Sequence, residues 1–334
     1  MPGYLVEGLR RRRAANLPPF TVMSCDNLPR NGAAAREAVV TLAAQTDQVL
    51  ARWIESNGAF PNSVVDRITP ATGGGDRAHL SDAYGLMDRW PVVTEPFSQW
   101  IVEDDFCDGR PPLEELGVEF VADPGVHELT KKRLLNGSHS AIGYLGYLAG
   151  HRRIDEAMAD PVLREYLAGL MDEEVRPALP ETAGLDLDGY RDRLIERFSN
   201  PAIGDQLTRL AGRGSVKMPA YLLPSLNEAI AEGRPHERMT LAVAGWFRYL
   251  RGTDLEGRAI PVQDPVADRL VALAKSAGAD PRPLLAERAI FGDLGDDAEF
   301  CRELEAAIRR LDSVGVVAAI EAIGVTGEPV AVAA

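Results

Sequence analysis

Cysteine is scarce in this sequence: Cys25, Cys107 and Cys301 stand far apart in a chain of 334 residues. An odd number of isolated cysteines predicts neither a disulfide framework nor a thiolate metal site, and it fits a reducing, cytoplasmic compartment. The five histidines form no His-x-x-x-His pair with metal-ligand spacing, so we predict no metal site. A Gly-x-Ser-x-Gly motif is also missing, which argues against an α/β-hydrolase triad.

Long hydrophobic runs and an excess of positive charge are missing as well. No apolar run approaches the ~20 residues that a membrane-spanning helix requires, and arginines follow Leu5 and Val6 too soon for a signal-peptide core. The net charge of −14 argues against a nucleic-acid partner, because polyanions bind to basic patches. The basic run Arg10–Arg13 lies at the predicted end of a helix, which favours a solvated helix end over an anion site.

The chain is long enough for two domains, and its character changes near residue 126. Before that point short strand-like runs alternate with helical segments, and beyond it helical patterns follow one another. We therefore predict an α/β part over residues 1–124 and an all-α substrate part over residues 125–334. The first part has the pattern of the outer portion of a Rossmann-like sheet, because it opens on a helix rather than on a strand and a Gly-rich turn.

The individual elements are predicted from hydrophobic period, Pro and Gly punctuation, and helix end signals. The strands expected in the first part cover residues 20–25, 63–66, 92–94, 100–103 and 118–121. The helices expected there cover residues 3–15 and 33–56. The helices expected in the second part cover residues 126–150, 152–176, 187–198, 200–212, 222–232, 236–251, 263–277, 297–311 and 313–323.

The densest polar cluster within a helical pattern runs from Lys131 to Ser140. At ~100° per residue, Lys131, His139 and Asn136 fall at about 0°, 80° and 140° around a helix axis, on one side of it. A lysine with a lowered pKa could act as a base there, and the Asn136 amide could donate to a developing alkoxide. Spacing alone favours the alternative, an exposed lysine and a core histidine whose hydrogen bonds are satisfied.

Two further segments carry weaker signals. Asn27 ends a strand-like run, where ligands of α/β proteins gather, although Asp26–Pro29 also has the composition of a turn. Gly73-x-Gly75-x-x-Ala78 formally fits a degenerate dinucleotide fingerprint, with Glu95 about 20 residues further on. Residues 69–72 separate these glycines from the preceding strand-like run, so we predict a flexible loop there and assign no cofactor-binding residues.

Several motifs, in order along essentially the whole chain, resemble the long-chain polyol dehydrogenase family, which includes mannitol 2-dehydrogenase and fructuronate reductase. They are the segments Phe20–Asn27, Val64–Pro70 and Trp100–Phe106, the pattern Lys131-x4-Asn136-x2-His139, the segment Glu196–Pro201, and the pair Lys217-x-Pro219. The resemblance implies a Rossmann-like domain followed by a helical domain, and an oxidoreductase that is often monomeric.

The resemblance also implies roles for individual residues. Lys131 matches the general base, Asn27 and Asn136 match the pair that holds the reacting oxygen, and His139 matches the histidine that binds this oxygen or its neighbour. The other matches are Val65 and Asp66, which line the substrate site, Arg209 and Lys217, which bind distal substrate hydroxyls, and Glu128, which gates proton passage. The implied reaction is metal-independent hydride transfer between NAD, or alternatively NADP, and a polyol or aldonate, as in mannitol/fructose or mannonate/fructuronate.

One departure from the family concerns the cofactor. The family carries a complete dinucleotide-binding half, with its glycine fingerprint, ahead of the residues that match positions 1–20 here. We therefore expect this chain alone to bind NAD(H) weakly or not at all. The second hypothesis is accordingly a truncated, non-catalytic binding or assembly module.

Overall fold

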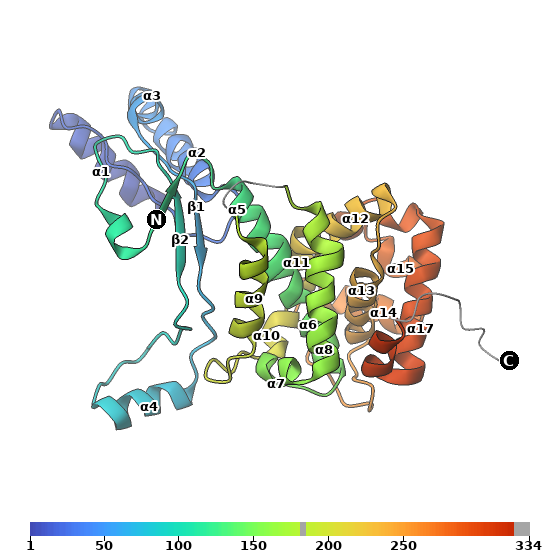
Figure 1. Cartoon of the computed structure of the whole chain (residues 1–334). Helices are drawn as coiled ribbons and strands as arrows, with labels where there is room; N and C mark the ends of the chain where they lie inside the picture. The colour runs from blue at the N-terminus through green and yellow to red at the C-terminus, as the bar shows by residue number, and fades with distance from the viewer. Residues whose placement is uncertain (181–184, 324–334) are drawn as a thin grey trace. The chain divides into compact units, whose positions relative to one another are not determined.

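The computed structural model describes residues 1–180 and 185–323. These residues form two compact units. The first contains Met1–Thr69 and Thr94–Leu129, and the second contains Pro70–Val93 and the described residues from Thr130 onward. No helix in the described ranges is long and apolar enough to cross a membrane. The predicted order, an α/β part with a small sheet followed by a mainly helical part, is confirmed (Figure 1).

Helices and a small mixed sheet make up the first unit. The helices are α1 (Pro2–Ala14), α2 (Asn31–Ala44), α3 (Gln48–Asn57), the 3-10 helix η1 (Leu113–Leu116) and α5 (Gly125–Thr130), of which the last residue falls in the second unit. The strands are β1 (Ser63–Asp66), β2 (Gln99–Glu103) and β3 (Glu119–Val121). In the order β1-β2-β3, β2 pairs antiparallel with β1 and parallel with β3.

The core of the first unit lies where α1, α2 and α3 pack together. Leu9, Val39 and Ile54 supply one buried side chain from each helix. The expected single helix over residues 33–56 is wrong, because Asp47 accepts hydrogen bonds from the backbone N–H groups of Val49 and Leu50 and starts a second helix. An aspartate in this position satisfies the donors that a helix start leaves free.

Two expected strands do not form a ladder. In segment 20–25 the Val22 N–H donates to the Ala59 carbonyl, but no neighbouring strand pairs with the segment among the described residues. Segment 92–94 has no regular structure. An apolar extended segment becomes a strand only when another backbone satisfies its polar groups in register.

The glycines near position 73 begin a helix rather than a flexible loop. Helix α4 covers Gly74–Tyr84, and the Asp76 carboxylate accepts from the Gly73 N–H at 2.7 Å. Residues 67–73 separate this helix from the end of β1. The segment therefore lacks the tight strand–turn–helix connection on which a dinucleotide fingerprint depends.

The second unit is helical and is built around α6 and α13, which pack against each other and against α10 and α17. Its further elements are η2 (Lys131–Asn136), α6 (Gly137–Leu148), α7 (Ile154–Ala159), α8 (Pro161–Gly169), η3 (Leu170–Val175), η4 (Arg176–Ala178), α9 (Leu187–Phe198), α10 (Leu207–Ala211), α11 (Gly214–Tyr221), α12 (Leu223–Glu232), α13 (Glu237–Leu250), α14 (Ala267–Ala277), α15 (Arg282–Leu285), α16 (Arg288–Phe291), η5 (Leu294–Asp296) and α17 (Ala298–Glu321).

An aromatic cluster fills the centre of this unit. Trp246 and Tyr249 of α13 lie against Tyr144 of α6, with ring centroids 6.1 and 5.4 Å apart. The three rings are almost fully buried, so they hold α6 rigidly by burying a large apolar area. Since α6 carries His139, the same packing fixes the helix that begins the candidate site.

Candidate active site

The segment Lys131–Asn136 is a π-helix, not the α-helix that the sequence predicts. Its wider bonding is visible at Gly137, whose N–H donates to the Lys132 carbonyl five residues earlier. A π-helix turns by less than ~100° per residue, so the angles expected between Lys131, Asn136 and His139 are wrong in detail. Short π-helices inside α-helices are frequent at functional sites, and this one begins at Lys131 and ends at Asn136.

Five polar side-chain atoms in or next to this π-helix are buried without a hydrogen-bond partner in the described part of the chain. They are Oγ1 of Thr130, Nε of Arg133, Nδ2 of Asn136, Oγ of Ser138 and Nε2 of His139. The His139 ring lies on the ring of Phe198, with centroids 4.4 Å apart and planes at 31°. Buried polar groups are normally hydrogen-bonded. An amide donor and an imidazole nitrogen left open in this way can therefore receive polar atoms of a ligand.

Positive charge surrounds His139. Burial lowers the pKa of its imidazole well below the usual 6.5, and the nearby charges of Arg209, Arg197, Lys217 and Lys131 lower it further. His139 is therefore neutral at pH 7, with one nitrogen that donates and one that accepts. The charges of Lys131, Arg209 and Lys217 therefore all act on His139 within the second unit.

Arg209 and Lys217 are each held by neighbouring groups. The Arg209 Nε donates to Oδ1 of the buried Asp205 at 2.6 Å, and its Nη2 donates to Oδ2. The Lys217 Nζ donates to the carbonyls of Arg209 and Leu210, each at 3.0 Å. Burial and the charges of two neighbouring arginines lower the pKa of Lys217 to about 8, although Asp205 opposes the shift.

A glycine on α6 allows α10 to come close. A Cβ at Gly143 would lie 3.1 Å from the Ala211 nitrogen and 3.1 Å from the Leu210 Cβ. Gly143 follows His139 by one helical turn, so this close packing brings the helix that carries Arg209 near the histidine. Neither Asp205 nor Gly143 was predicted from the sequence. The closeness of α10 to α6, on which their roles depend, appears only in the folded unit.

The remaining predicted residues belong to the first unit. Asn27 lies exposed in the loop before α2, and Val65 and the buried Asp66 end strand β1. Glu128 accepts a hydrogen bond from the Arg30 N–H at 3.1 Å, which ties it to the end of the Asn27 loop. The predicted site residues thus fall into two sets, each placed by its own unit.

A residue that sequence reasoning missed holds the Asn27 loop. The Asn31 side chain is 2% exposed, and its Nδ2 lies 3.0–3.2 Å from the carbonyls of Ser24, Asp26 and Ser63 and from the Ser63 hydroxyl. Its Oδ1 accepts from the Ser63 N–H at 2.8 Å. An asparagine at the start of a helix normally indicates only a helix start or a turn, so these contacts could not be predicted from the sequence.

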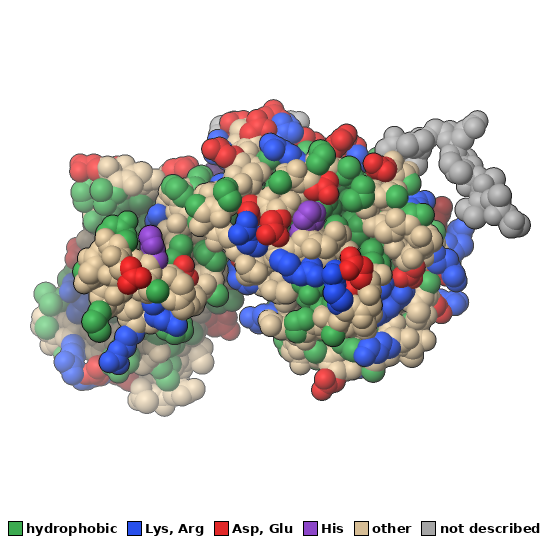
Figure 2. All heavy atoms as spheres, turned by 90° about the horizontal axis from the view of Figure 1, so that it is seen from below, with side chains coloured by type: hydrophobic (Ala, Val, Ile, Leu, Met, Phe, Trp, Pro, Cys, Tyr) green, Lys and Arg blue, Asp and Glu red, His purple; other side chains and the backbone are tan. Residues whose placement is uncertain are grey.

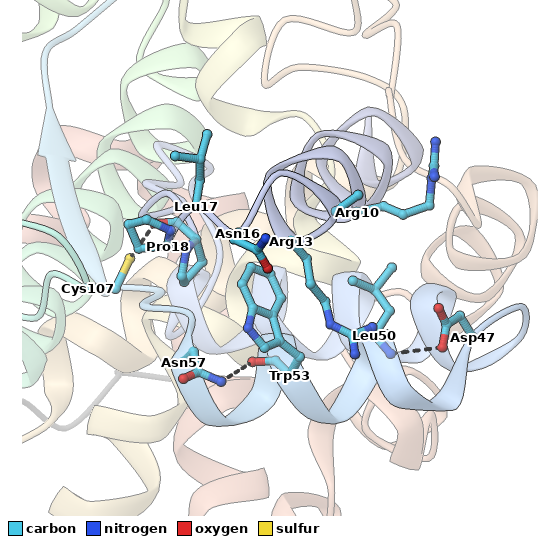
Figure 3. A pocket seen from close by; sticks show the side chains of 12 residues that line it. Arg10, Arg13, Asn16, Leu17, Pro18, Asp47, Leu50, Trp53, Asn57 and Cys107 are labelled. Atoms are coloured by element: carbon cyan, nitrogen blue, oxygen red, sulfur yellow. Dashed lines mark hydrogen bonds between the residues drawn. The ribbon is translucent and has the colours of Figure 1, made fainter.

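A cavity of about 810 Å³ lies elsewhere in the first unit, between α1, α3 and the turn at Pro18 (Figure 3). Arg13 and Trp53 line it, and none of the predicted site residues does. Over residues 1–180 and 185–323, no group of three or more His, Cys, Asp or Glu side chains is arranged to hold a metal ion. Acidic and basic side chains are interspersed on the face shown in Figure 2.

Comparison with known families identifies both parts of the chain. Residues 1–115 match the mannitol dehydrogenase Rossmann domain, and residues 126–312 match the mannitol dehydrogenase C-terminal domain. The chain belongs to the mannitol dehydrogenase family. The resemblance inferred from the motifs is thereby confirmed.

Members of the family are similar over nearly the whole chain. A mannitol 2-dehydrogenase of Aspergillus fumigatus is 47% identical over 320 residues, which cover 94% of this chain and 63% of the relative. A Saccharomyces cerevisiae mannitol dehydrogenase is 45% identical over 325 residues, which cover 96% of this chain and 64% of the relative. The chain therefore spans a little under two thirds of the length of these curated relatives.

Two solved structures share the fold. The Pseudomonas fluorescens mannitol 2-dehydrogenase, in a ternary complex with NAD and D-mannitol, is 42% identical with a TM-score of 0.85, covering 98% of this chain and 66% of that one. A D-sorbitol dehydrogenase in substrate-free form is 38% identical with a TM-score of 0.87, and the match covers 96% of this chain and 66% of that one. The Rossmann-plus-helical architecture of this chain is thus that of its family.

Proposed function

We propose that this chain is the polyol-oxidising part of an NAD-dependent oxidoreductase. The reaction is the oxidation of a secondary alcohol of D-mannitol or a similar polyol to the ketone. The observation that supports it most is the open, buried pair Asn136 Nδ2 and His139 Nε2, surrounded by Lys131, Arg209 and Lys217. Family membership supports the substrate class. NADP in place of NAD, and an aldonate such as mannonate in place of mannitol, belong to the same proposal.

Each predicted catalytic residue has its own role in the reaction. Lys131 takes the hydroxyl proton of the reacting carbon as general base, and Asn136, together with Asn27, donates hydrogen bonds to the oxygen as it gains negative charge. The neutral His139 binds the same oxygen or the next hydroxyl. In the reverse direction Lys131 returns the proton. Lysine and amide groups stabilise the alkoxide here, so we propose that no metal ion takes part.

Binding of the rest of the substrate falls to the other residues. Arg209 and Lys217 donate to distal hydroxyls, or to the carboxylate of an aldonate. Val65 and Asp66 line the substrate site, and Glu128 gates the passage of the proton. These assignments follow the family motifs. The role of Arg209 and Lys217 in binding substrate is supported further because the charges of both residues act on His139.

When bound, NAD would supply the hydride acceptor for the substrate carbon. The residues that hold it are not assigned, because the glycines at 73–75 start a helix without the strand–turn–helix connection that grips a pyrophosphate. We propose that residues 1–124 are part of the nucleotide domain, that residues 125–334 are the substrate domain, and that the protein is cytoplasmic.

An assay of D-mannitol oxidation tests the proposal. Because this chain is expected to bind NAD weakly, the assay uses millimolar NAD. Under these conditions we expect the purified chain to form NADH in the presence of D-mannitol, and treatment with a metal chelator to leave the rate unchanged. D-mannonate in a parallel reaction separates the two substrate classes. If neither substrate is oxidised while calorimetry detects mannitol binding, the chain is a binding module and the catalytic proposal fails.

A further inference from the structure

The loop that carries Asn27 is fastened at both ends within the first unit. At its start, the Asn31 carboxamide lies within hydrogen-bond distance of the carbonyls of Ser24 and Asp26. At its end, the Arg30 N–H donates to Glu128, and Arg30 itself adopts a left-handed conformation with φ 45°. Asn27 lies between these two fastenings, in a loop whose exposed backbone would otherwise have many accessible conformations.

The same Asn31 side chain fastens the loop to strand β1. It accepts from the Ser63 N–H and donates toward the Ser63 carbonyl and hydroxyl, while that hydroxyl donates to the Ser24 carbonyl at 2.6 Å. Ser63 precedes Val65 and Asp66 by two and three residues on β1. One buried amide therefore joins the loop of Asn27 to the strand that carries two other predicted substrate residues.

Close packing keeps Asn31 in this position. The next residue is Gly32, where a Cβ would lie 2.3 Å from the Phe60 carbonyl oxygen and 2.4 Å from that of Pro61. Helix α2 therefore begins against the chain that leads into β1, and only glycine fits at the point of contact. The asparagine beside it is almost fully enclosed, so its polar groups depend on the protein for their partners.

We propose that Asn31 is a positioning residue for Asn27, and that it sets the loop by donating hydrogen bonds to the Ser24 and Asp26 carbonyls. Its catalytic consequence rests on the proposed function, since it acts through the contact of Asn27 with the reacting oxygen. The local part of the claim, that Asn31 holds the loop, does not depend on any activity.

Hydrogen exchange tests the local part in the full chain. We expect Asn31→Ala to raise the exchange rates of the Asp26 and Leu28 amides roughly tenfold, because the loop loses the hydrogen bonds that hold its carbonyls. Asn31→Asp keeps the acceptor for Ser63 but loses the donors, so it should behave like Asn31→Ala. The control Val39→Ala removes core packing in α2 and should speed exchange throughout the first unit. Unchanged loop exchange in Asn31→Ala, or a response equal to that of Val39→Ala, overturns the proposal.

A double-mutant cycle tests the catalytic part. We expect Asn27→Ala and Asn31→Ala each to lower kcat on D-mannitol by roughly 10²-fold with little change in KM, and the double variant to be no slower than either. If the two decreases in kcat multiply in the double variant, Asn31 does not act through Asn27. If the unsubstituted chain oxidises no polyol, the proposed function fails, and the exchange rates still decide whether Asn31 holds the loop.

Discussion

The carboxylate of Asp205 binds the guanidinium of Arg209 through two parallel hydrogen bonds, one of them Nε to Oδ1 at 2.6 Å. Asp205 is 1% exposed, whereas Arg209 is 41% exposed. The pair therefore fixes the plane of the guanidinium from its buried side and leaves Nη1 for a ligand. Geometry of this kind is specific to arginine and a carboxylate.

Removing the charge of Asp205 tests the importance of this orientation. We expect Asp205→Asn to raise the KM for D-mannitol roughly tenfold with a small effect on kcat, because Arg209 loses its orientation but does not touch the reacting carbon. Stability should fall by only about 1–2 kcal/mol, since solvent screens the exposed arginine. Asp312 of α17 forms ion pairs with Arg248 of α13 and with Arg251, which follows α13, and Asp312→Asn is the matched control. A KM increase of the same size in Asp312→Asn would refute the assignment.

Lys217 gives a pH-dependent prediction. Its folded-state pKa is about 8 against an ordinary 10.5, so its ammonium is lost as pH rises through about 8, and KM should rise over the same range. Lys217→Arg keeps the charge and should remove this dependence. Because the unfolded chain binds more protons between these two pKa values, stability should rise with pH in that window. Lys217→Met should abolish that slope, and a slope of the same size in this variant would contradict the assignment.

His139 should remain neutral under all ordinary assay conditions. Its lowered pKa predicts that its proton resonances do not shift between about pH 8 and pH 6 in NMR spectra. His236 serves as the internal control: burial opposes its protonation, but the Arg234 carbonyl and Glu303 raise its pKa, so it should titrate. Below the unfolded-state pKa of 6.5, the unfolded chain takes up a proton that folded His139 does not, so this residue should reduce stability as pH falls. A His139 resonance that titrates near pH 6.5 would show that the ring is not enclosed by the cations.

The sequence predicted the broad architecture because hydrophobic period and helix end signals are local properties. The prediction from sequence failed where contacts with other segments of the chain decide the local structure. Segment 20–25 has strand composition but lacks a paired neighbour, and the π-helix at Lys131–Asn136 cannot be distinguished from an α-helix by period over six residues. The motifs placed Lys131 and His139 in one site, whereas Asp205 and Asn31 act through contacts that only the folded units create.

The kcat of Lys131→Met on D-mannitol with NAD, compared with that of Lys132→Met, tests the central claim most directly. Both lysines lie in the same π-helix, so the two variants disturb it to a similar extent, and only Lys131 is assigned the proton. We predict that Lys131→Met lowers kcat roughly 10³-fold, while Lys132→Met stays within about threefold and both variants unfold at the temperature of the unsubstituted chain. A Lys131→Met variant that oxidises D-mannitol at the unsubstituted rate would contradict the account.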